Sequence, residues 1–387
     1  MSKLLIMHGG GPTAVLNSSL YGAICGAKES SEIDEIYASQ SGVWGLFNDK
    51  LIDLTNIPQS DLELLKTTPG SAIGTGRDHL EEEDYDTLAQ ILADKGFSYV
   101  LMTGGNGTMD TAKKLSQRCL KHNIVVVGVP KTMDNDLSKT DHSPGFPSAA
   151  RYLAGSIKEV AQDVKGLAIH VVVVEAFGRD AGWICASSAL AREKAGDAPH
   201  LILCPEQAFN EDDFLAKVKK VYDEKGSAVV VASEGLRYAD GTPIVDPIFT
   251  VGRSVYFGDV SSHLAQLVTK KLGIKARSEK PGILSRAATM WSSEIDVEEA
   301  VLCGRKAVEL ALEKKSGYMP VIVRTSTEPY HSEIQALEID ESILEAKIMP
   351  ESYLDKENYD VTEDYIKWLK PLVKPELQKY ISFIDCE

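Results

Sequence analysis

The segment Val129–Leu137, VPKTMDNDL, places charged and hydroxyl side chains directly after an apolar run typical of a buried strand. If the segment is extended, its side chains alternate between two faces, and Lys131 and Asn135 share one of them. The opposite face then carries one hydroxyl and two carboxylates: Thr132, Asp134 and Asp136. Beside a phosphate group, one carboxylate can help to hold Mg²⁺ while the other accepts a proton from an attacking hydroxyl. A solvated turn capped by an aspartate is the alternative interpretation.

Three glycine-rich segments could bind anions: HGGGPT (8–13), PGSAIGTGR (69–77) and TGGNGT (103–108). Each is expected to follow a strand-like or extended segment, and glycine lets a ligand approach the main chain closely. A helix that begins just after such a turn offers unpaired amides. Because ligands bind at the carboxyl ends of strands in α/β sheets, three such loops favour phosphate binding over plain tight turns. The P-loop motif and the dinucleotide fingerprint are absent, which disfavours a P-loop enzyme and a Rossmann dehydrogenase.

The bulk composition excludes several classes of protein. The 387 residues include 41 Lys and Arg against 57 Asp and Glu, a net charge of −16, so general nucleic-acid binding is not expected. No signal-peptide cleavage site is recognised, and no run of about 18 apolar residues predicts a membrane span. The six cysteines show no C-x-x-C spacing. We therefore expect free thiols in a reducing cytoplasm.

Apolar strand-like runs alternate with helical segments along most of the chain. Val- and Ile-rich runs such as NIVVVGV, LAIHVVVVEAF and AVVVASEG predict parallel strands that are covered on both faces, and hence an α/β protein. The stretch DHSPGF (141–146) marks a boundary between domains. The tail from about residue 351 is predicted to form short helices interrupted by Pro371 and Pro375.

Several motifs carry a family resemblance when they are taken together: GGNGTMDTA, PKTMDNDL, EAFGRDAGW, SEG and RSEKPGILSRAA. Over about residues 4–323 and in this order, the chain resembles the phosphofructokinase family, whose members use ATP or pyrophosphate. The resemblance implies two facing Rossmann-like three-layer domains with mainly parallel sheets and the site in the cleft. It implies a donor domain of residues 1–140 with part of 255–316, a sugar-phosphate domain of 141–254 with about 317–345, and a C-terminal helical appendage of 346–387.

The resemblance also implies roles for particular residues. Asp134 matches the base on the sugar hydroxyl, Thr132 contacts the transferred phosphoryl group, and Arg179 stabilises the transition state or holds the sugar. The implied sugar-phosphate residues are Thr132, Asp134, Phe177, Gly178, Arg179, Glu234, Arg277 and Arg286. The implied donor residues are Gly9, Gly10, Arg77, Gly105, Asn106, Gly107, Thr108 and Lys131. Asn106 and Asp136 are the implied Mg²⁺ ligands, and the family's shared sites imply a homodimer or homotetramer.

Three positions depart from the common bacterial ATP-dependent pattern. Asn106 replaces an aspartate that helps to hold Mg²⁺, and the pyrophosphate-using branch often has asparagine there. His170 replaces an arginine that reaches into a neighbouring subunit's sugar-phosphate site, and Ile283 replaces a histidine of the same site. The last two positions leave the identity of the sugar phosphate open.

Gly107 and Lys131 decide the expected donor. Pyrophosphate-dependent members usually have aspartate and lysine at these positions, and ATP-dependent members usually have glycine at both. An aspartate about 4 Å from the α-phosphate of ATP would repel it by roughly 4 kcal/mol at an effective dielectric constant of about 20. Because Gly107 avoids this repulsion, we expect an ATP-dependent kinase of glycolysis that phosphorylates the 1-hydroxyl of fructose 6-phosphate. The alternatives are a pyrophosphate-dependent enzyme, with fructose 6-phosphate or sedoheptulose 7-phosphate as acceptor, and a non-catalytic sugar-phosphate sensor.

Overall fold

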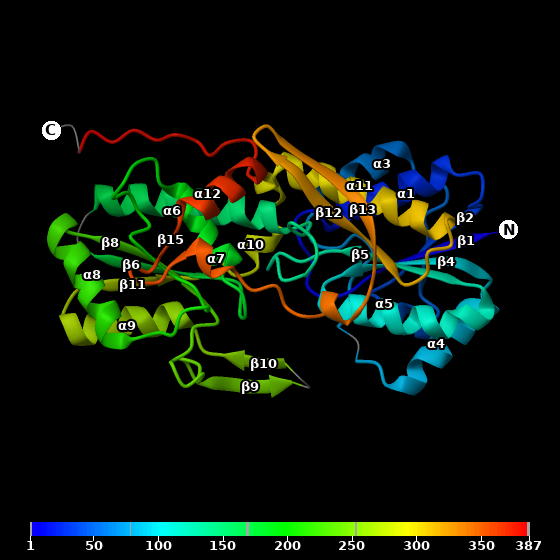
Figure 1. Ribbon diagram of the computed structural model, residues 1–387, viewed down its shortest axis with the longest axis horizontal. Helices are drawn as coiled ribbons and strands as arrows, with labels where there is room; N and C mark the ends of the chain where they lie inside the picture. Colours follow the sequence, from blue (N-terminus) through cyan, green and yellow to red (C-terminus); the bar gives the residue numbers. More distant parts are fainter. Residues whose placement is uncertain (1, 78, 168–169, 252–253, 385–387) are drawn as a thin grey trace. The chain divides into compact units, whose positions relative to one another are not determined.

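The structure is a computed structural model that describes residues 2–77, 79–167, 170–251 and 254–384. The chain forms two units, one of residues 1–149 and 286–347 and the other of residues 150–285 and 348–387. Each unit has a sheet of mainly parallel strands with helices on both faces, which confirms the predicted α/β fold (Figure 1). Among the described residues, no helix combines the length and the apolar character needed to cross a bilayer.

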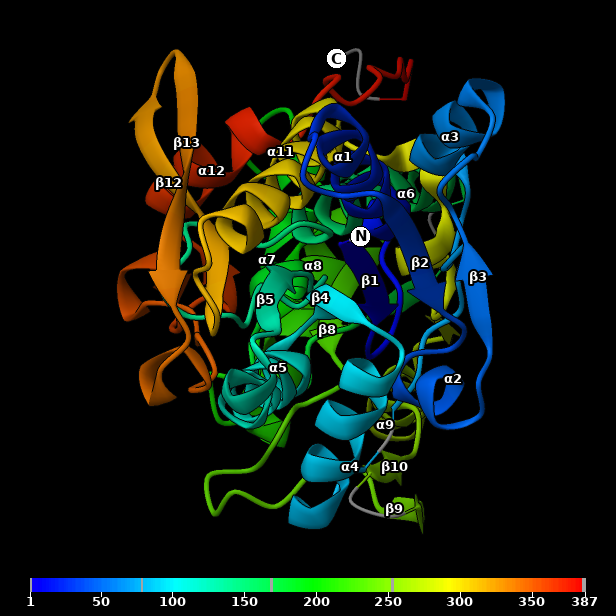
Figure 2. The same ribbon diagram turned by 90° about the vertical axis from the view of Figure 1, so that its right-hand side faces the viewer.

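The first unit is built on a seven-stranded sheet in the order β13-β12-β5-β4-β1-β2-β3. In Figure 2, the β12–β13 pair lies at the left and β3 at the right. Its strands are β1 (Lys3–His8), β2 (Glu35–Ser39), β3 (Leu51–Asp53), β4 (Phe97–Gly104), β5 (Val125–Pro130), β12 (Tyr318–Thr327) and β13 (Tyr330–Glu338). The pairs β2–β3 and β12–β13 are antiparallel, and the others are parallel. The Val-rich run of β5 is buried throughout, as expected for a strand that is covered on both faces.

Helices cover both faces of this sheet. They are α1 (Leu16–Glu29), α2 (Val43–Phe47), α3 (Gln59–Leu64), α4 (Glu82–Asp94), α5 (Asn106–Cys119) and α11 (Glu294–Leu312). The helices α1 and α11 enclose one apolar core with Leu4, Ile6 and Leu101, and α4 and α5 enclose another with Leu5 and Met102. Figure 1 shows these two pairs of helices on opposite sides of the sheet.

The second unit contains a four-stranded parallel sheet in the order β11-β6-β8-β7. Its strands are β6 (Val171–Ala176), β7 (Leu201–Leu203), β8 (Ala228–Ser233) and β11 (Ala276–Glu279), with two small ladders of β9 (Pro247–Val251), β10 (Ser254–Phe257), β14 (Leu354–Asp355) and β15 (Asp360–Val361). Its helices are α7 (Trp183–Ser187), α8 (Glu211–Lys225), α9 (Val260–Leu272) and α12 (Glu363–Leu369), together with most of α6 (Phe146–Gly166). The short α10 (Leu284–Ala287) lies at the boundary between the units.

The two units divide the chain differently from the predicted domains. Residues 317–345 belong to the first unit because β12 pairs with β5, with Tyr318 opposite Val127. Residues 255–285 and 348–387 belong to the second unit, so the tail is not a separate appendage. Its Tyr359 carbonyl accepts a hydrogen bond of 2.7 Å from the amide of Ile202 in β7. Pairing between segments so distant in sequence leaves no local sequence signal.

Candidate active site

The three glycine-rich segments meet in the first unit. The amide of Gly9 donates to the carbonyl of Thr103 at 2.8 Å, and the amide of Gly10 donates to the carbonyl of Gly76 at 2.8 Å. The hydroxyl of Thr75 donates to the carbonyl of Gly10 at 2.7 Å. The first and third segments follow strands β1 and β4, as predicted, whereas the second follows a 3₁₀ turn at Leu65–Thr67. The expected strand before residue 69 is therefore wrong, although the loop joins the same site.

Close backbone approach explains two of the glycines. A Cβ atom on Gly9 or Gly104 would lie 2.4 or 2.1 Å from the Thr108 hydroxyl oxygen, so neither position has room for a larger residue. Gly105 precedes α5, whose first turn offers unpaired amides toward these loops. Among the described residues, no atom lies within 4 Å of a Cβ placed on Gly107, so this position faces open space.

Three cationic side chains surround Gly11. The buried ammonium of Lys131 donates to the Gly11 carbonyl at 2.5 Å. A Cβ on Gly11 would lie 2.6 Å from Nη1 of Arg286 and 3.5 Å from Nη2 of Arg77. Three positive charges beside one glycine loop, together with the first turn of α5, form a site suited to a highly charged phosphate compound.

Burial lowers the pKa of Lys131 to about 8, against the attraction of Asp134 and Asp136, and repulsion from Arg77 and Arg286 lowers it further. The nearby His8 is also buried, and burial followed by the charge of Lys131 lowers its pKa to about 3. At neutral pH, His8 is therefore a neutral imidazole, while the ammonium of Lys131 stays mostly charged.

Arg286 lies at the glycine-rich segment 8–13, although the sequence grouped it with Arg277 as a residue of the sugar phosphate. Its guanidinium is beside Gly11 in the first unit, while Arg277 belongs to the second unit. The Nε atom of Arg286 is buried and has no hydrogen-bond partner among the described residues. This placement gives the glycine-rich segments a cation that the sequence did not predict for them.

The TMDND segment is a tight turn, so the predicted extended alternation is wrong. Asn135 has a left-handed φ of 54°, which is incompatible with a strand. The hydroxyl of Thr132 accepts a hydrogen bond from the amide of Asp134 at 3.1 Å and donates to Oδ1 of Asp136 at 2.8 Å. These hydrogen bonds bring the side chains of Thr132 and Asp136 together and hold the backbone of Asp134 beside them.

Asn106 and Asp136, the predicted metal ligands, are in contact. The Asn106 amide nitrogen donates to Oδ2 of Asp136 at 3.1 Å and to its carbonyl at 3.2 Å. The amide oxygen Oδ1 of Asn106 is buried without a hydrogen-bond partner among the described residues. Mg²⁺ binds to one or two protein oxygens together with water and substrate phosphate, so this pair fits the ion. No cluster of three or more His, Cys, Asp or Glu side chains suited to a metal occurs in the described part of the chain.

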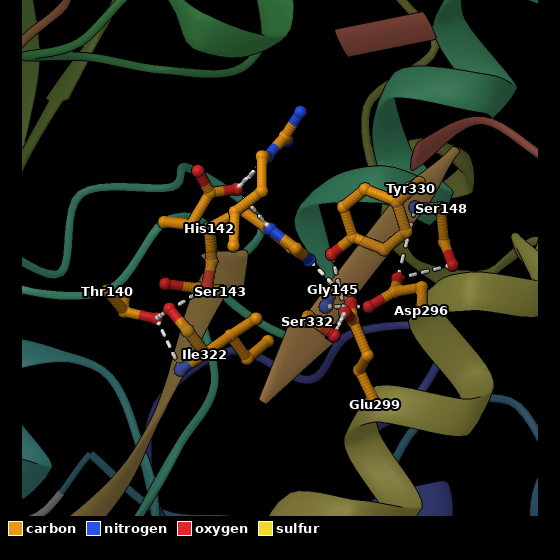
Figure 3. A network of polar contacts seen from close by, with 12 residues as sticks. Thr140, His142, Ser143, Gly145, Ser148, Asp296, Glu299, Ile322, Tyr330 and Ser332 are labelled. Carbon is orange, nitrogen blue, oxygen red and sulfur yellow. Dashed lines mark hydrogen bonds and ion pairs between the residues drawn. The ribbon is translucent and has the colours of Figure 1, made fainter. Parts of the chain in front are cut away.

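A buried polar network anchors the chain as it leaves this turn (Figure 3). His142 is fully buried, with its ring nitrogens 2.9 Å from Asp141 and 2.6 Å from Glu299 of α11. Glu299 also accepts hydrogen bonds from Tyr330 at 2.5 Å and Ser332 at 2.6 Å. Burial alone would lower the pKa of His142, but Glu299 and Asp141 raise it to about 9. The imidazolium therefore links the loop to α11.

A second carboxylate of α11 holds the next turn of the same segment. Asp296 accepts hydrogen bonds from the amide of Gly145 at 2.9 Å and from the amide and hydroxyl of Ser148 at 3.0 and 2.5 Å. Burial raises its pKa to about 6, although these hydrogen bonds oppose the shift. The segment 140–148 is thus fixed to the core of the first unit at two positions.

In the second unit, the FGRDAG and SEG motifs lie at the carboxyl ends of neighbouring strands, β6 and β8. The hydroxyl of Ser233 donates to the carbonyl of Gly178 at 2.6 Å and accepts from the amide of Gly235 at 3.0 Å. The guanidinium of Arg179 lies 5.6 Å from the ring centroid of Phe257. Burial raises the pKa of Glu234, and the charge of Arg179 opposes that shift. Arg179 and Glu234 are therefore close together, and Phe177 and Gly178 lie on the same loop.

Arg277 is not brought together with this pair. It is exposed on β11, opposite Val172 near the start of β6, whereas the Arg179 loop follows the end of β6. Burial, followed by repulsion from Arg277, lowers the pKa of His170, which places these two residues near each other. Ile283, the third of the positions that depart from the family pattern, is exposed.

The TMDND turn, residues 132–136, is called the acidic turn. The sequence interpretation missed three residues that support it: Asp296, Glu299 and Lys347. A helical pattern could have revealed the first two, because Asp296 and Glu299 share the face of α11 that buries Ala300 and Cys303. No sequence pattern pointed to Lys347.

The glycine loops, the acidic turn and the two α/β units define a phosphate-binding enzyme of the α/β class. A family model described as phosphofructokinase matches residues 3–311. The chain therefore belongs to the phosphofructokinase family, as its motifs had indicated.

Relatives with similar sequences cover nearly the whole chain. A pyrophosphate–fructose 6-phosphate 1-phosphotransferase of Xanthomonas campestris pv. campestris (strain B100) is 37% identical over 402 residues, which cover 98% of this chain and 96% of the relative. A sulfofructose kinase of Alkalicoccus urumqiensis is 27% identical, with 96% and 95% covered. The crystal structure of a pyrophosphate-dependent phosphofructokinase from Marinobacter aquaeolei has a TM-score of 0.89 and 34% identity, and covers 99% of this chain and 94% of its own.

Proposed function

We propose that this protein transfers a phosphoryl group from pyrophosphate to the 1-hydroxyl of fructose 6-phosphate, which gives fructose 1,6-bisphosphate and orthophosphate. The reaction type follows from membership of the phosphofructokinase family. The proposal also includes a cytoplasmic location, a place in glycolysis and a homodimeric or homotetrameric assembly.

The donor in this proposal is pyrophosphate, although the sequence favoured ATP. The observation that carries it is the buried Lys131 ammonium, bonded to Gly11 and joined there by Arg77 and Arg286. Such a concentration of positive charge matches a small donor whose charges all lie close to the transferred phosphorus. The relatives from Xanthomonas and Marinobacter, which are named for pyrophosphate, support the same donor.

In the proposed reaction, the acidic turn accepts a proton and the cationic side chains neutralise negative charge on the phosphate groups. Asp134 would accept the proton of the sugar 1-hydroxyl while the hydroxyl oxygen forms a bond to phosphorus. Orthophosphate would then leave toward Lys131. Thr132 would contact the migrating phosphoryl group. Asp136 and Asn106 would hold Mg²⁺, which neutralises phosphate charge when it is bound.

The second unit would supply the sugar-phosphate groups. Glu234 would accept hydrogen bonds from sugar hydroxyls, and Arg179 would neutralise charge on the equatorial oxygens of the transferred group. Arg277 and His170 form a separate pair at the other end of β6, so the proposal gives them no role in the chemical step.

ATP is the second candidate donor because Gly107 faces open space in which a nucleotide would meet no carboxylate. The acceptor also has an alternative. Ile283 and His170 differ from the family pattern, and the 27% identical relative from Alkalicoccus is named for sulfofructose.

A direct comparison of substrates tests this proposal. Purified protein with Mg²⁺ receives pyrophosphate or ATP, and fructose 6-phosphate or sedoheptulose 7-phosphate, and the bisphosphate product is measured. We expect kcat/KM for pyrophosphate with fructose 6-phosphate to exceed that for ATP at least 100-fold. A preference for ATP would reject the donor, and turnover with sedoheptulose 7-phosphate alone would reject the acceptor.

A further inference from the structure

Lys347 contacts the acidic turn from a position more than 200 residues later in the chain. Its ammonium donates to the carbonyls of Thr140 and Asp141 at 3.0 Å each and to the Asn135 side-chain oxygen at 3.3 Å. Its backbone amide donates to the carbonyl of Asp136 at 2.9 Å. Lys347 therefore joins two segments of the loop. The first, residues 134–136, is called the Asp134 limb, and the second, residues 140–148, is called the returning limb because it leads into α6.

The limb that carries Asp134 has a demanding conformation. Asn135 takes a left-handed φ of 54°, a conformation that is uncommon outside glycine and that asparagine adopts more readily than most residues. Its side-chain oxygen accepts hydrogen bonds from the amide of Ser143 and from Lys347. The Asn135 side chain is fully buried, so these contacts are shielded from water. They hold the residue that lies between the proposed base and the proposed metal ligand.

The returning limb is already fixed to the core. His142 joins it to Glu299, and Asp296 holds Gly145 and Ser148, as Figure 3 shows. A side chain that ties the Asp134 limb to this anchored limb therefore limits the movement of both.

We propose that Lys347 is a positioning residue for phosphoryl transfer: its ammonium clamps the Asn135–Asp136 limb to the Thr140–Asp141 limb and so holds the Asp134 carboxylate in place. This inference rests on the proposed function. It assigns a role to Lys347, which lies at the start of the predicted appendage 346–387 and belongs to the first unit.

The positive charge is needed because the three acceptors described above are oxygens, and an ammonium can donate a proton to each of them. These hydrogen bonds are part-buried, so the protein keeps this cation in a poorly solvated place. An uncharged side chain of similar length could fill the space but could not make these hydrogen bonds.

The kinetic test compares Lys347→Met with Lys139→Met. Lys139 is an exposed lysine of the same loop, and its substitution should leave kcat unchanged. A displacement of about 1 Å at a reacting group can lower the rate about 100-fold, so kcat of Lys347→Met should fall about 10- to 100-fold with KM for the sugar phosphate changed less than threefold. Unchanged kcat in Lys347→Met would overturn the inference.

Chemical rescue separates positioning from general damage to the fold. The kcat of Lys347→Ala should rise, with saturation, when ethylammonium is added, whereas Asp134→Ser should not respond. No rise at any ethylammonium concentration would contradict the role of the charge.

Amide hydrogen exchange tests the clamp by Lys347 independently of the proposed substrates. Exchange of the amides in residues 133–141 should be at least tenfold faster in Lys347→Met than in the unsubstituted protein. Unchanged exchange would reject the clamp. If the unsubstituted protein did not use pyrophosphate and fructose 6-phosphate, the proposed function alone would fail, and the exchange rates would still decide the role of Lys347.

Discussion

Replacing Lys131 by methionine should stabilise the protein while removing most of its activity. Lys131 is buried at the donor loop, and its ammonium bonds to the Gly11 carbonyl. Burial lowers its pKa to about 8 from the ordinary 10.5, so the folded protein disfavours the charge that the donor needs. Methionine has a similar length and carries no charge, which removes this penalty.

The magnitude follows from the shift in pKa. The difference between 10.5 and about 8 corresponds to about 3 kcal/mol of folding free energy. Loss of the hydrogen bond to Gly11 offsets about 1 kcal/mol, which leaves a net gain of about 2 kcal/mol. Because the folded-state pKa lies below the unfolded-state value, the penalty is fully present below pH 8 and disappears as the pH rises to 10.5.

Urea unfolding measures this gain, and steady-state kinetics measures its functional consequence. Lys131→Met should be about 2 kcal/mol more stable at pH 7, and this advantage should shrink toward pH 10. The exposed Lys220→Met serves as the control and should change stability by less than about 0.5 kcal/mol. Loss of a charge about 4 Å from the donor should lower kcat/KM for pyrophosphate about 10²- to 10³-fold. A less stable Lys131→Met, or an advantage that does not vary with pH, would refute this reasoning.

Three further predictions concern the donor, the base and the anchoring network. Gly107→Asp should lower ATP use at least tenfold more than pyrophosphate use, because the carboxylate fits into open space beside the donor; equal losses in parallel kinetic assays would show that charge at this position does not select the donor. Asp134→Ser should lower kcat about 10²- to 10⁴-fold with little change in KM for the sugar, and a near-normal kcat would exclude Asp134 as the base. The pKa of His142 is raised to about 9 from 6.5, so its contribution is complete below pH 6.5 and is lost as the pH rises through 9. Urea unfolding should show about 2 kcal/mol less stability at pH 8 than at pH 6.5, and His142→Gln should lose this slope; an unchanged slope in the variant would assign it to other groups.

Local patterns predicted the parts of the fold that depend on local sequence. The runs KLLIMH, FSYVLMT and NIVVVGV form β1, β4 and β5, because continuous apolar strands suit a sheet covered on both faces. The glycine loops at 8–13 and 103–108 lie at the carboxyl ends of strands as predicted, since φ > 0 and close backbone approach leave a clear mark in composition.

Features that depend on distant contacts were not predictable in this way. The TMDND turn combines local hydrogen bonds of Thr132 to Asp134 and Asp136 with a distant contact from Lys347, whereas the alternation rule applies only to extended chain. Strands β12 and β13 joined the first sheet through pairing with β5. The position of Arg286 beside Gly11 likewise results from tertiary structure.

The most direct test of the central claim follows pyrophosphate itself by ³¹P NMR. The protein is incubated with Mg²⁺, fructose 6-phosphate and pyrophosphate, and the phosphorus signals are recorded over time. We expect the pyrophosphate signal to be replaced by those of orthophosphate and fructose 1,6-bisphosphate in equal amounts. A pyrophosphate signal that persists, while ATP is consumed in a parallel incubation that contains ATP instead of pyrophosphate, would contradict the account.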